Sequence, residues 1–218
     1  MMKPSMFLLA TLVLGLLTAT NARSEIYIGG QAGYSMPKEL SGLRGVKDNE
    51  GSTASNLKLS ESMAFGAKVG FFLPDWFKWL GAEIDLYGSQ PSVKAQAISG
   101  TFPALAGVTS VSRSSLTMVH LNANVLVRYP GSTFQPYVGI GVGQNLGFLG
   151  ASNFSVQDGS ISTSLNLLAG LRVFVTETVA LFGEFKQNQS KLSFIDNQFD
   201  AKYRANLAMF GVTFHFGR

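Results

Sequence analysis

The sequence predicts an all-β protein, an eight-stranded antiparallel up-and-down transmembrane β-barrel with four long external loops. Three observations support this fold class. Eight segments alternate apolar and polar residues with the period of two that strands have, each segment can span a bilayer as a tilted strand of about 9–11 residues, and short links alternate with longer ones along the chain. A closed barrel pairs every backbone donor and acceptor, which an open sheet in lipid cannot do.

The chain begins with the features of a cleavable export signal. Lys3 gives a positive start, residues 6–17 carry no charge, and the small residues of 18–22 suit cleavage after Ala22. As a helix, the uncharged run would span ~18 Å, which is too short for a hydrocarbon core of ~30 Å. We therefore predict a signal peptide at 1–22 and a barrel domain at 23–218.

The first four predicted strands each have one apolar face. They cover 25–36, 62–73, 79–89 and 117–129. Their apolar faces carry, in order, Ile26, Ile28, Ala32 and Tyr34; Phe65, Ala67, Val69 and Phe71; Leu80, Ala82, Ile84 and Leu86; and Val119, Leu121, Ala123, Val125, Val127 and Tyr129. Residues of this pattern fit a sheet that has a different environment on each side.

The last four predicted strands repeat the pattern, and they cover 135–147, 162–175, 179–190 and 203–216. In the first of them, Val138, Ile140 and Val142 alternate with glycines, and in the last, Phe210, Val212, Phe214 and Phe216 alternate with Thr213 and His215. The short links are 74–78, 130–134 and 176–178, and the long ones are 37–61, 90–116, 148–161 and 191–202. This alternation of link lengths is typical of outer-membrane barrels.

The composition agrees with a membrane barrel. Apolar residues make up 46% of the chain and charged residues only 14%, whereas about a quarter is usual in soluble domains. The 24 glycines suit tight turns, and the 17 phenylalanines suit aromatic girdles. Without cysteine there is no disulfide, thiolate metal site or thiol nucleophile, and a net charge of +4 is weak support for nucleic-acid binding. The same small charge is compatible with contact to anionic lipid headgroups.

A soluble, lipocalin-like barrel is the main structural alternative, with its apolar face inside. We favour the reverse arrangement, because the polar face carries ionisable residues that could pair with each other in a narrow lumen. We expect Lys68 and Arg128 to be partners of Glu83 and Asp85, and Arg172 and Lys186 to be partners of Glu184. The predicted lumen charge network, with a structural role, is Lys68, Glu83, Asp85, Arg128, Arg172, Glu184 and Lys186.

Four phrases carry a resemblance to a known family: Phe134-Gln135-Pro136-Tyr137-Val138-Gly139-Ile140-Gly141-Val142-Gly143, Leu168-Ala169-Gly170-Leu171-Arg172-Val173-Phe174, Leu181-Phe182-Gly183-Glu184-Phe185-Lys186 and Gly211-Val212-Thr213-Phe214-His215-Phe216. The chain resembles the eight-stranded outer-membrane β-barrel proteins of Gram-negative bacteria that are built like the membrane domain of outer membrane protein A. The resemblance implies an outer-membrane location and insertion by the barrel-assembly machinery. That machinery reads a C-terminal strand ending in an aromatic residue, here Phe214 and Phe216, which Gly217 and Arg218 follow.

The sequence offers little for catalysis, metal binding or cofactor binding. His120 and His215 lie on the polar face, and barrel enzymes that deacylate lipid A use a serine and a histidine, but the same-face neighbour of His215 is Thr213. We predict no catalytic, metal or cofactor site. The glycines Gly139, Gly141 and Gly143 do not form a phosphate-binding loop, since no helix follows them.

The long loops are where surface partners would bind. The second loop is unusually apolar, with Ala95-Gln96-Ala97-Ile98 and Phe102-Pro103-Ala104-Leu105, and we expect it to form a hairpin rather than contact a hydrophobic ligand. Trp76, Phe77 and Trp79 predict an aromatic girdle at the first short turn.

Three functions are compatible with this sequence. We favour a non-enzymatic barrel with a filled lumen and a structural or surface-interaction role through its loops. Its expected partners are outer-membrane lipids and lipopolysaccharide, the assembly machinery and surface molecules, but not nucleic acid. The alternatives are a small pore or lateral transporter for small or hydrophobic solutes and, more remotely, a lipid-modifying enzyme.

Overall fold

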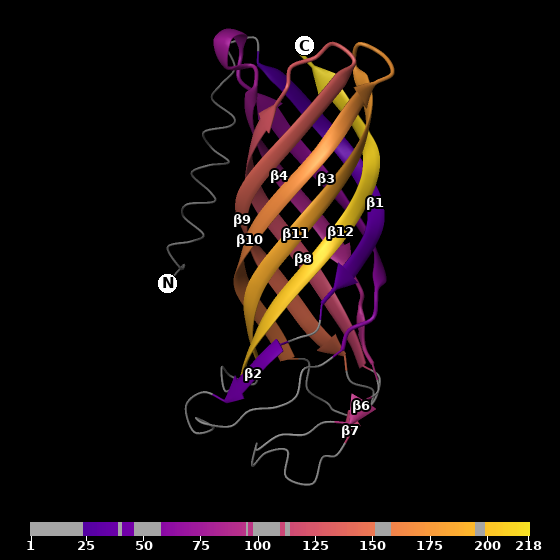
Figure 1. Cartoon of the computed structure of the whole chain (residues 1–218), viewed down its shortest axis with the longest axis vertical. Coiled ribbons are helices and arrows are strands. Elements are labelled where there is room, and N and C mark those ends of the chain that lie inside the picture. Colours follow the sequence, from indigo (N-terminus) through magenta and orange to yellow (C-terminus); the bar gives the residue numbers. More distant parts are fainter. Residues whose placement is uncertain are drawn as a thin grey trace.

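The structure is a computed structural model that describes residues 24–38, 41–45, 58–94, 96–97, 110–111, 114–150, 158–194 and 199–218. Long tilted strands form the wall of a closed barrel (Figure 1). In their order around the wall these strands are β1 (Glu25–Pro37), β3 (Ser62–Phe72), β4 (Leu80–Ser89), β8 (Ser114–Arg128), β9 (Phe134–Gly150), β10 (Asp158–Phe174), β11 (Val179–Phe194) and β12 (Phe199–Phe216).

Each of these strands pairs antiparallel with its neighbours in the sequence, and β1 pairs with β12 to close the barrel. The closing ladder joins Ile26 to Phe216 at one end and Pro37 to Ala205 at the other. No edge remains among the eight wall strands, so their backbone groups are satisfied within the sheet. The predicted fold class, an eight-stranded up-and-down barrel, is confirmed.

The two faces of the wall differ as the sequence pattern predicts. On β1, Ile26 and Ile28 are 48% and 53% exposed, whereas the alternating residues Glu25 and Tyr27 are buried. The same alternation continues around the barrel, with exposed side chains such as Phe65, Val125, Ile140, Leu165, Phe185 and Phe210. Apolar groups therefore face outward and the polar residues face the lumen, which excludes the lipocalin-like arrangement.

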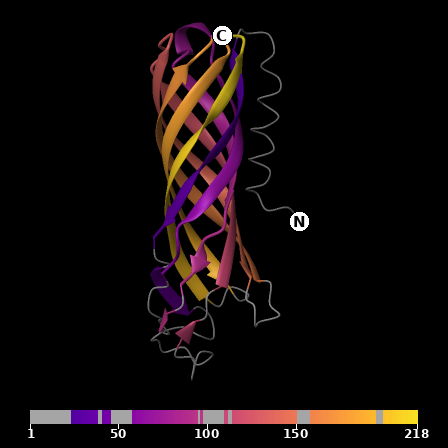
Figure 2. The ribbon, with the colours of Figure 1, turned by 90° about the vertical axis from the view of Figure 1, so that its right-hand side faces the viewer.

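The short links and the C-terminus lie at one end of the barrel, and the described short strands of the longer connections lie at the other (Figures 1 and 2). The first short link contains the 3-10 turn η2 (Asp75–Phe77). Trp76 and Phe77 in this turn and Trp79 just after it are 91%, 56% and 40% exposed, as an aromatic girdle requires.

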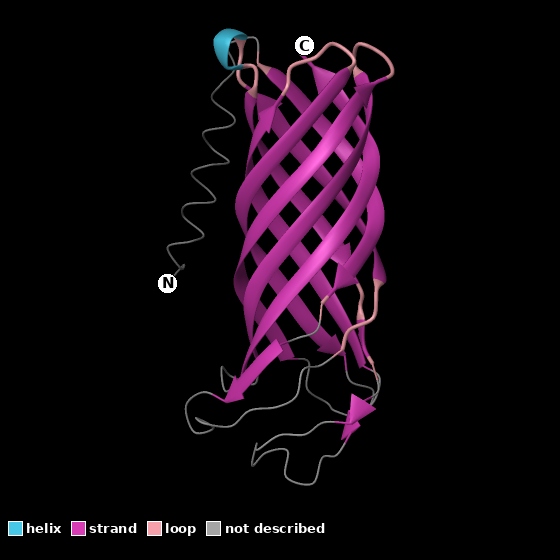
Figure 3. Ribbon diagram, in the orientation of Figure 1, coloured by secondary structure: helices cyan, strands magenta, loops and turns pink. Residues whose placement is uncertain are grey.

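At the long-loop end, four strands extend further than their hydrophobic pattern predicted (Figure 3). β9 continues to Gly150 and β10 begins at Asp158, while β11 and β12 stay paired up to Phe194 and Phe199. Residues 148–150 and 158–161 of the first predicted loop, and residues 191–194 and 199–202 of the second, are therefore strand. The alternation of apolar and polar residues ends where the outward residues become polar. The backbone pairing between the strands continues beyond that point.

Short strands lie at the same end of the barrel. β2 (Ser41–Gly45) pairs with β12, and β5 (Ser92–Val93) pairs with β8. β6 (Gln96–Ala97) and β7 (Ser110–Val111) pair with each other, so the predicted hairpin in the second long loop is confirmed. The predicted signal peptide and the Phe102-Pro103-Ala104-Leu105 segment lie outside the described residues. No helix in the described ranges is long and apolar enough to cross a membrane.

Candidate functional site: the interior of the barrel

Five charged side chains meet at the centre of the lumen, and we call them the central network: Lys68, Glu83, Asp85, Glu184 and Lys186. Lys68 Nζ lies 3.3 Å from Oε2 of Glu83 and 3.0 Å from Oε1 of Glu184. Lys186 Nζ lies 2.9 Å from Oε1 of Glu184 and is also paired with Asp85. All five side chains are fully buried, so each charge depends on these partners rather than on water.

Neutral donors complete the coordination of the three acids. They project from strands on other sides of the lumen, so the network is bonded in several directions. The bonds run from Tyr27 Oη to Glu83 at 2.7 Å, from Gln31 Nε2 to Asp85 at 2.6 Å, from Asn124 Nδ2 to Glu83 at 3.3 Å and from Tyr137 Oη to Glu184 at 2.8 Å. Buried ions with this many hydrogen bonds are the kind that persist in protein interiors.

Arg128 does not pair with Glu83 or Asp85, contrary to the expectation from the sequence. Glu83 lies opposite Asn124, and Arg128 is four residues further toward the short-turn end, a shift of about 13 Å along a strand. There Arg128 Nη2 donates to Oε2 of Glu25 at 2.7 Å. Glu25 is not among the predicted lumen charges, because it is the first residue of β1 and no alternating residue precedes it. In the structure, Glu25 is identified by its burial and by its ion pair with Arg128.

Arg172 also has a different environment from the one expected. Glu184 lies opposite Gly170, whereas Arg172 lies opposite Phe182, closer to the short turns, and Glu184 is instead shared by the two lysines. The Arg172 guanidinium lies over three rings, with centroid distances of 4.4 Å to Tyr27, 5.1 Å to Tyr137 and 5.5 Å to Phe72. Within the part of the chain that the structure describes, no atom accepts a hydrogen bond from this group.

With Glu25 included, the buried charges in the described strands balance. The acids are Glu25, Glu83, Asp85 and Glu184, and the bases are Lys68, Arg128, Arg172 and Lys186. A lumen of zero net charge has no excess sign that would attract one class of ion.

The two histidines are both buried in the lumen, at different heights. His120 stacks on Tyr87 with ring centroids 4.6 Å apart and shares a 2.7 Å hydrogen bond with Asn145. His215 lies between Glu25, 2.6 Å from Nδ1, and Thr213, whose Oγ1 is 2.9 Å from Nε2.

An acid, a histidine and a hydroxyl in this order are the components of a nucleophilic triad. Here the Thr213 hydroxyl is fully buried, so a substrate carbonyl cannot reach it. A group of three or more His, Asp or Glu residues that could hold a metal ion does not occur in the described ranges.

The remainder of the lumen is filled by amides and, toward the long loops, by apolar residues. Asn145 donates to Asn188 at 2.7 Å, and Asn166 donates to Asn124 at 2.8 Å. Beyond this layer lies a cluster that the sequence analysis did not anticipate: Leu59, Ala64, Tyr87, Leu116, Met118, Tyr203, Ala205, Leu207 and Met209. Several of these residues lie where β8 and β12 are apolar on both faces. There, alternation alone does not predict which residues face the lumen.

Comparisons with known proteins agree with this architecture. The family described as outer membrane protein beta-barrel domain matches residues 6–216. The fold is similar to that of Neisserial surface protein A, NspA, with 15% identity, a TM-score of 0.57 and coverage of 88% of this chain and 97% of that one.

It is also similar to Ail, the attachment invasion locus protein of Yersinia pestis, in complex with the heparin analogue sucrose octasulfate. That match has 15% identity, a TM-score of 0.53 and coverage of 88% of this chain and 99% of Ail. A comparison with curated protein sequences gave no match. The closed barrel with apolar residues outside and paired charges inside, together with the match over residues 6–216, shows that the chain belongs to the outer-membrane β-barrel domain family and is a protein of the outer membrane.

Proposed function

We propose that this protein is a non-enzymatic and non-conducting outer-membrane barrel that acts as a structural and surface-interacting element of the envelope. The observation that carries the proposal is the central network, which joins strands across the lumen. Lys68 on β3 and Glu184 on β11 are separated around the wall by β1 and β12, and their ion pair of 3.0 Å crosses the interior.

Further contacts obstruct a path through the barrel at other heights. Toward the short turns, the pair of Glu25 and Arg128 joins β1 to β8. Toward the long loops, the fully buried Leu116, Met118 and Leu207 fill the interior. Ions would have to break buried charge pairs in order to pass, and removing one partner of such a pair costs about 3–5 kcal/mol.

The test is ion conductance of refolded 23–218 in a planar lipid bilayer. We expect no unit steps, with insertion verified separately by protease protection and by heat-dependent gel mobility. Stable steps of constant size would contradict the proposal and favour the small-pore alternative. Uptake of a hydrophobic dye into proteoliposomes, compared with protein-free liposomes, tests the lateral route in the same preparation.

The absence of catalysis needs its own test. Outer-membrane lipid incubated with the refolded barrel should keep its mass spectrum unchanged. An altered lipid would contradict the proposal if the change disappeared in either His120→Gln or His215→Gln. The names of NspA and Ail, a surface protein and an attachment protein, support looking for partners at the long-loop end.

A further inference from the structure

Strands β10 and β11 separate from each other before either of them ends. Their pairing stops at Ser164 and Ser190, which lie opposite each other. Beyond this point, residues 158–163 of β10 continue as strand and pair with β9, while residues 191–194 of β11 continue as strand and pair with β12. In the described ranges no pairing joins these two segments, so each has one backbone edge without a partner strand. We call the two segments the fork.

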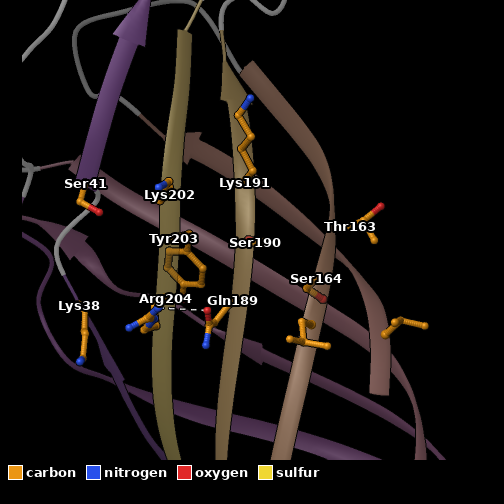
Figure 4. A pocket seen from close by; sticks show the side chains of 12 residues that line it. Lys38, Ser41, Thr163, Ser164, Gln189, Ser190, Lys191, Lys202, Tyr203 and Arg204 are labelled. Atoms are coloured by element: carbon orange, nitrogen blue, oxygen red, sulfur yellow. Dashed lines mark hydrogen bonds between the residues drawn. The ribbon is translucent and has the colours of Figure 1, made fainter. Parts of the chain in front are cut away.

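A groove of about 690 Å³ lies at the base of the fork (Figure 4). Among the residues that line it are Thr163 and Ser164 of β10 and Gln189, Ser190 and Lys191 of β11. These residues lie on both sides of the point where the pairing of the two strands stops. The open space of the wall therefore coincides with the start of the unpaired edges.

The free edge of β10 is long enough to pair with another strand. Residues 158–163 span about 20 Å, which is the length of an ordinary strand in a sheet. Ile161 is 67% exposed and Thr163 is also exposed, so this edge carries β-branched side chains of the kind that pack well against a neighbouring strand. Extended peptides bind to sheet edges of this kind through main-chain hydrogen bonds.

The side chains at the base of the fork favour an acidic partner. Lys38, Lys202 and Arg204 are exposed and line the groove, and none of its lining residues in the described ranges is acidic. Arg204 donates to the Oε1 atom of Gln189 at 3.1 Å, and this neutral amide does not cancel the charge of the guanidinium (Figure 4). A second copy of this chain would bring the same cations to the fork, and lysines near a sheet edge oppose such pairing.

We propose that the fork is a docking site for an extended, acidic peptide segment of a surface partner. The segment adds a strand to the free edge of β10 and places acidic side chains beside Lys202 and Arg204. This docking rests on the surface-interacting role proposed above and names the class of partner. It is independent of the lumen, so a barrel that conducted ions but bound the peptide would contradict the non-conducting role and leave the docking site intact.

The test uses the refolded barrel in neutral detergent and a fluorescent peptide of alternating threonine and glutamate. Fluorescence anisotropy should show saturable binding of this peptide, and a peptide of alternating threonine and lysine should not bind. An analogue that is methylated at alternate backbone nitrogens keeps the acidic charges but cannot donate along one edge, so its affinity should fall about tenfold. Equal affinities of the methylated and unmethylated peptides would overturn the proposal, because charge alone would then hold the peptide.

Amide hydrogen exchange locates the bound peptide. Binding should slow the exchange of residues 158–163, whose free edge becomes paired. The exchange of residues 164–173 should stay unchanged, because both neighbouring strands already pair with them. Binding without protection of residues 158–163 would overturn the assignment to the edge of β10.

A pair of variants tests the preference for acidic side chains. Lys202→Gln/Arg204→Gln should bind the threonine–glutamate peptide about tenfold more weakly than the wild type. Both side chains are exposed, so the variant should fold, which heat-dependent gel mobility verifies. The matched control, Lys78→Gln/Lys94→Gln, removes two exposed cations outside the groove and should keep the wild-type affinity. Equal loss of affinity in the two variants would show a non-specific charge effect and would overturn the proposal.

Discussion

Lys68 and Glu184, which are 116 residues apart in the sequence, form an ion pair of 3.0 Å in the middle of the lumen. Each also contacts a second ion, Glu83 for the lysine and Lys186 for the glutamate. Ion pairs therefore join strands that are not neighbours across the interior, in addition to the backbone hydrogen bonds between neighbouring strands.

Removing Glu184 should destabilise the barrel. Glu184→Ala leaves Lys68 and Lys186 buried with fewer partners, which we expect to lower the free energy of unfolding by about 3–5 kcal/mol. The measurement is the denaturant midpoint of the band that migrates as folded in an unboiled gel. Glu177→Ala, an exposed acid in a short turn, is the control and should keep the wild-type midpoint. Equal midpoints for both variants would contradict the role of the network.

Glu25 and Arg128 should be energetically coupled, although the sequence analysis did not pair them. In a double-mutant cycle of Glu25→Gln and Arg128→Met, we expect a coupling energy of about 1–3 kcal/mol, since the two groups are bonded at 2.7 Å and nearly buried. The same cycle between Arg128→Met and Asp85→Asn should give a coupling that is close to zero. A larger coupling to Asp85 than to Glu25 would favour the original pairing.

Glycines facing the lumen and glycines facing lipid should respond differently to an added methyl group. A Cβ at Gly141 would collide with the side chain of Asn124 and the carbonyl of Ala123, whereas a Cβ at Gly30 would meet no atom within 4 Å. Gly141→Ala should cost about 1–3 kcal/mol through overpacking. Gly30→Ala should be neutral or slightly stabilising, because it reduces the freedom of the unfolded chain. Urea titration of both variants checks this, and a reversed order would mean that the lumen is not packed.

Arginine should be tolerated differently at two outward positions of β11. Phe185→Arg places a charge in the apolar band and should cost about 2–4 kcal/mol, whereas Gln189→Arg, at the polar end of the wall, should cost about 0–1 kcal/mol. Folding into vesicles of phosphatidylcholine measures both. Similar costs at the two positions would show that the hydrocarbon boundary lies elsewhere on β11.

The end of the chain should act through Phe216 more than through the two residues after it. Phe216 pairs with Ile26 and is 59% exposed, while Arg218 stacks on Phe174 at 3.5 Å and bonds to the carbonyls of the turn at Gly131 and Ser132. We predict that Phe216→Ala slows insertion by the barrel-assembly machinery. Deletion of residues 217–218 should leave the rate unchanged and cost about 0.5–1 kcal/mol of stability. A slower rate for the deletion alone would contradict this assignment.

The sequence by itself determined the number of wall strands, the up-and-down order and the face that each strand turns outward. These features follow from period-two alternation, which is local, as in Ile26 and Ile28 against Tyr27. The membrane location followed from the same apolar face, since a closed barrel with this face outside is stable only in lipid.

Only the tertiary structure decided which charges meet. Partners such as Lys68 and Glu184 lie on strands that are not neighbours, and their meeting depends on tilt, stagger and closure, which alternation does not encode. Because of the same stagger, Arg128 pairs with Glu25 and not with Asp85, and Arg172 lies among aromatic rings. The fork likewise depends on strand pairing beyond the apolar band, because polar residues there give no hydrophobic signal that they continue as strands.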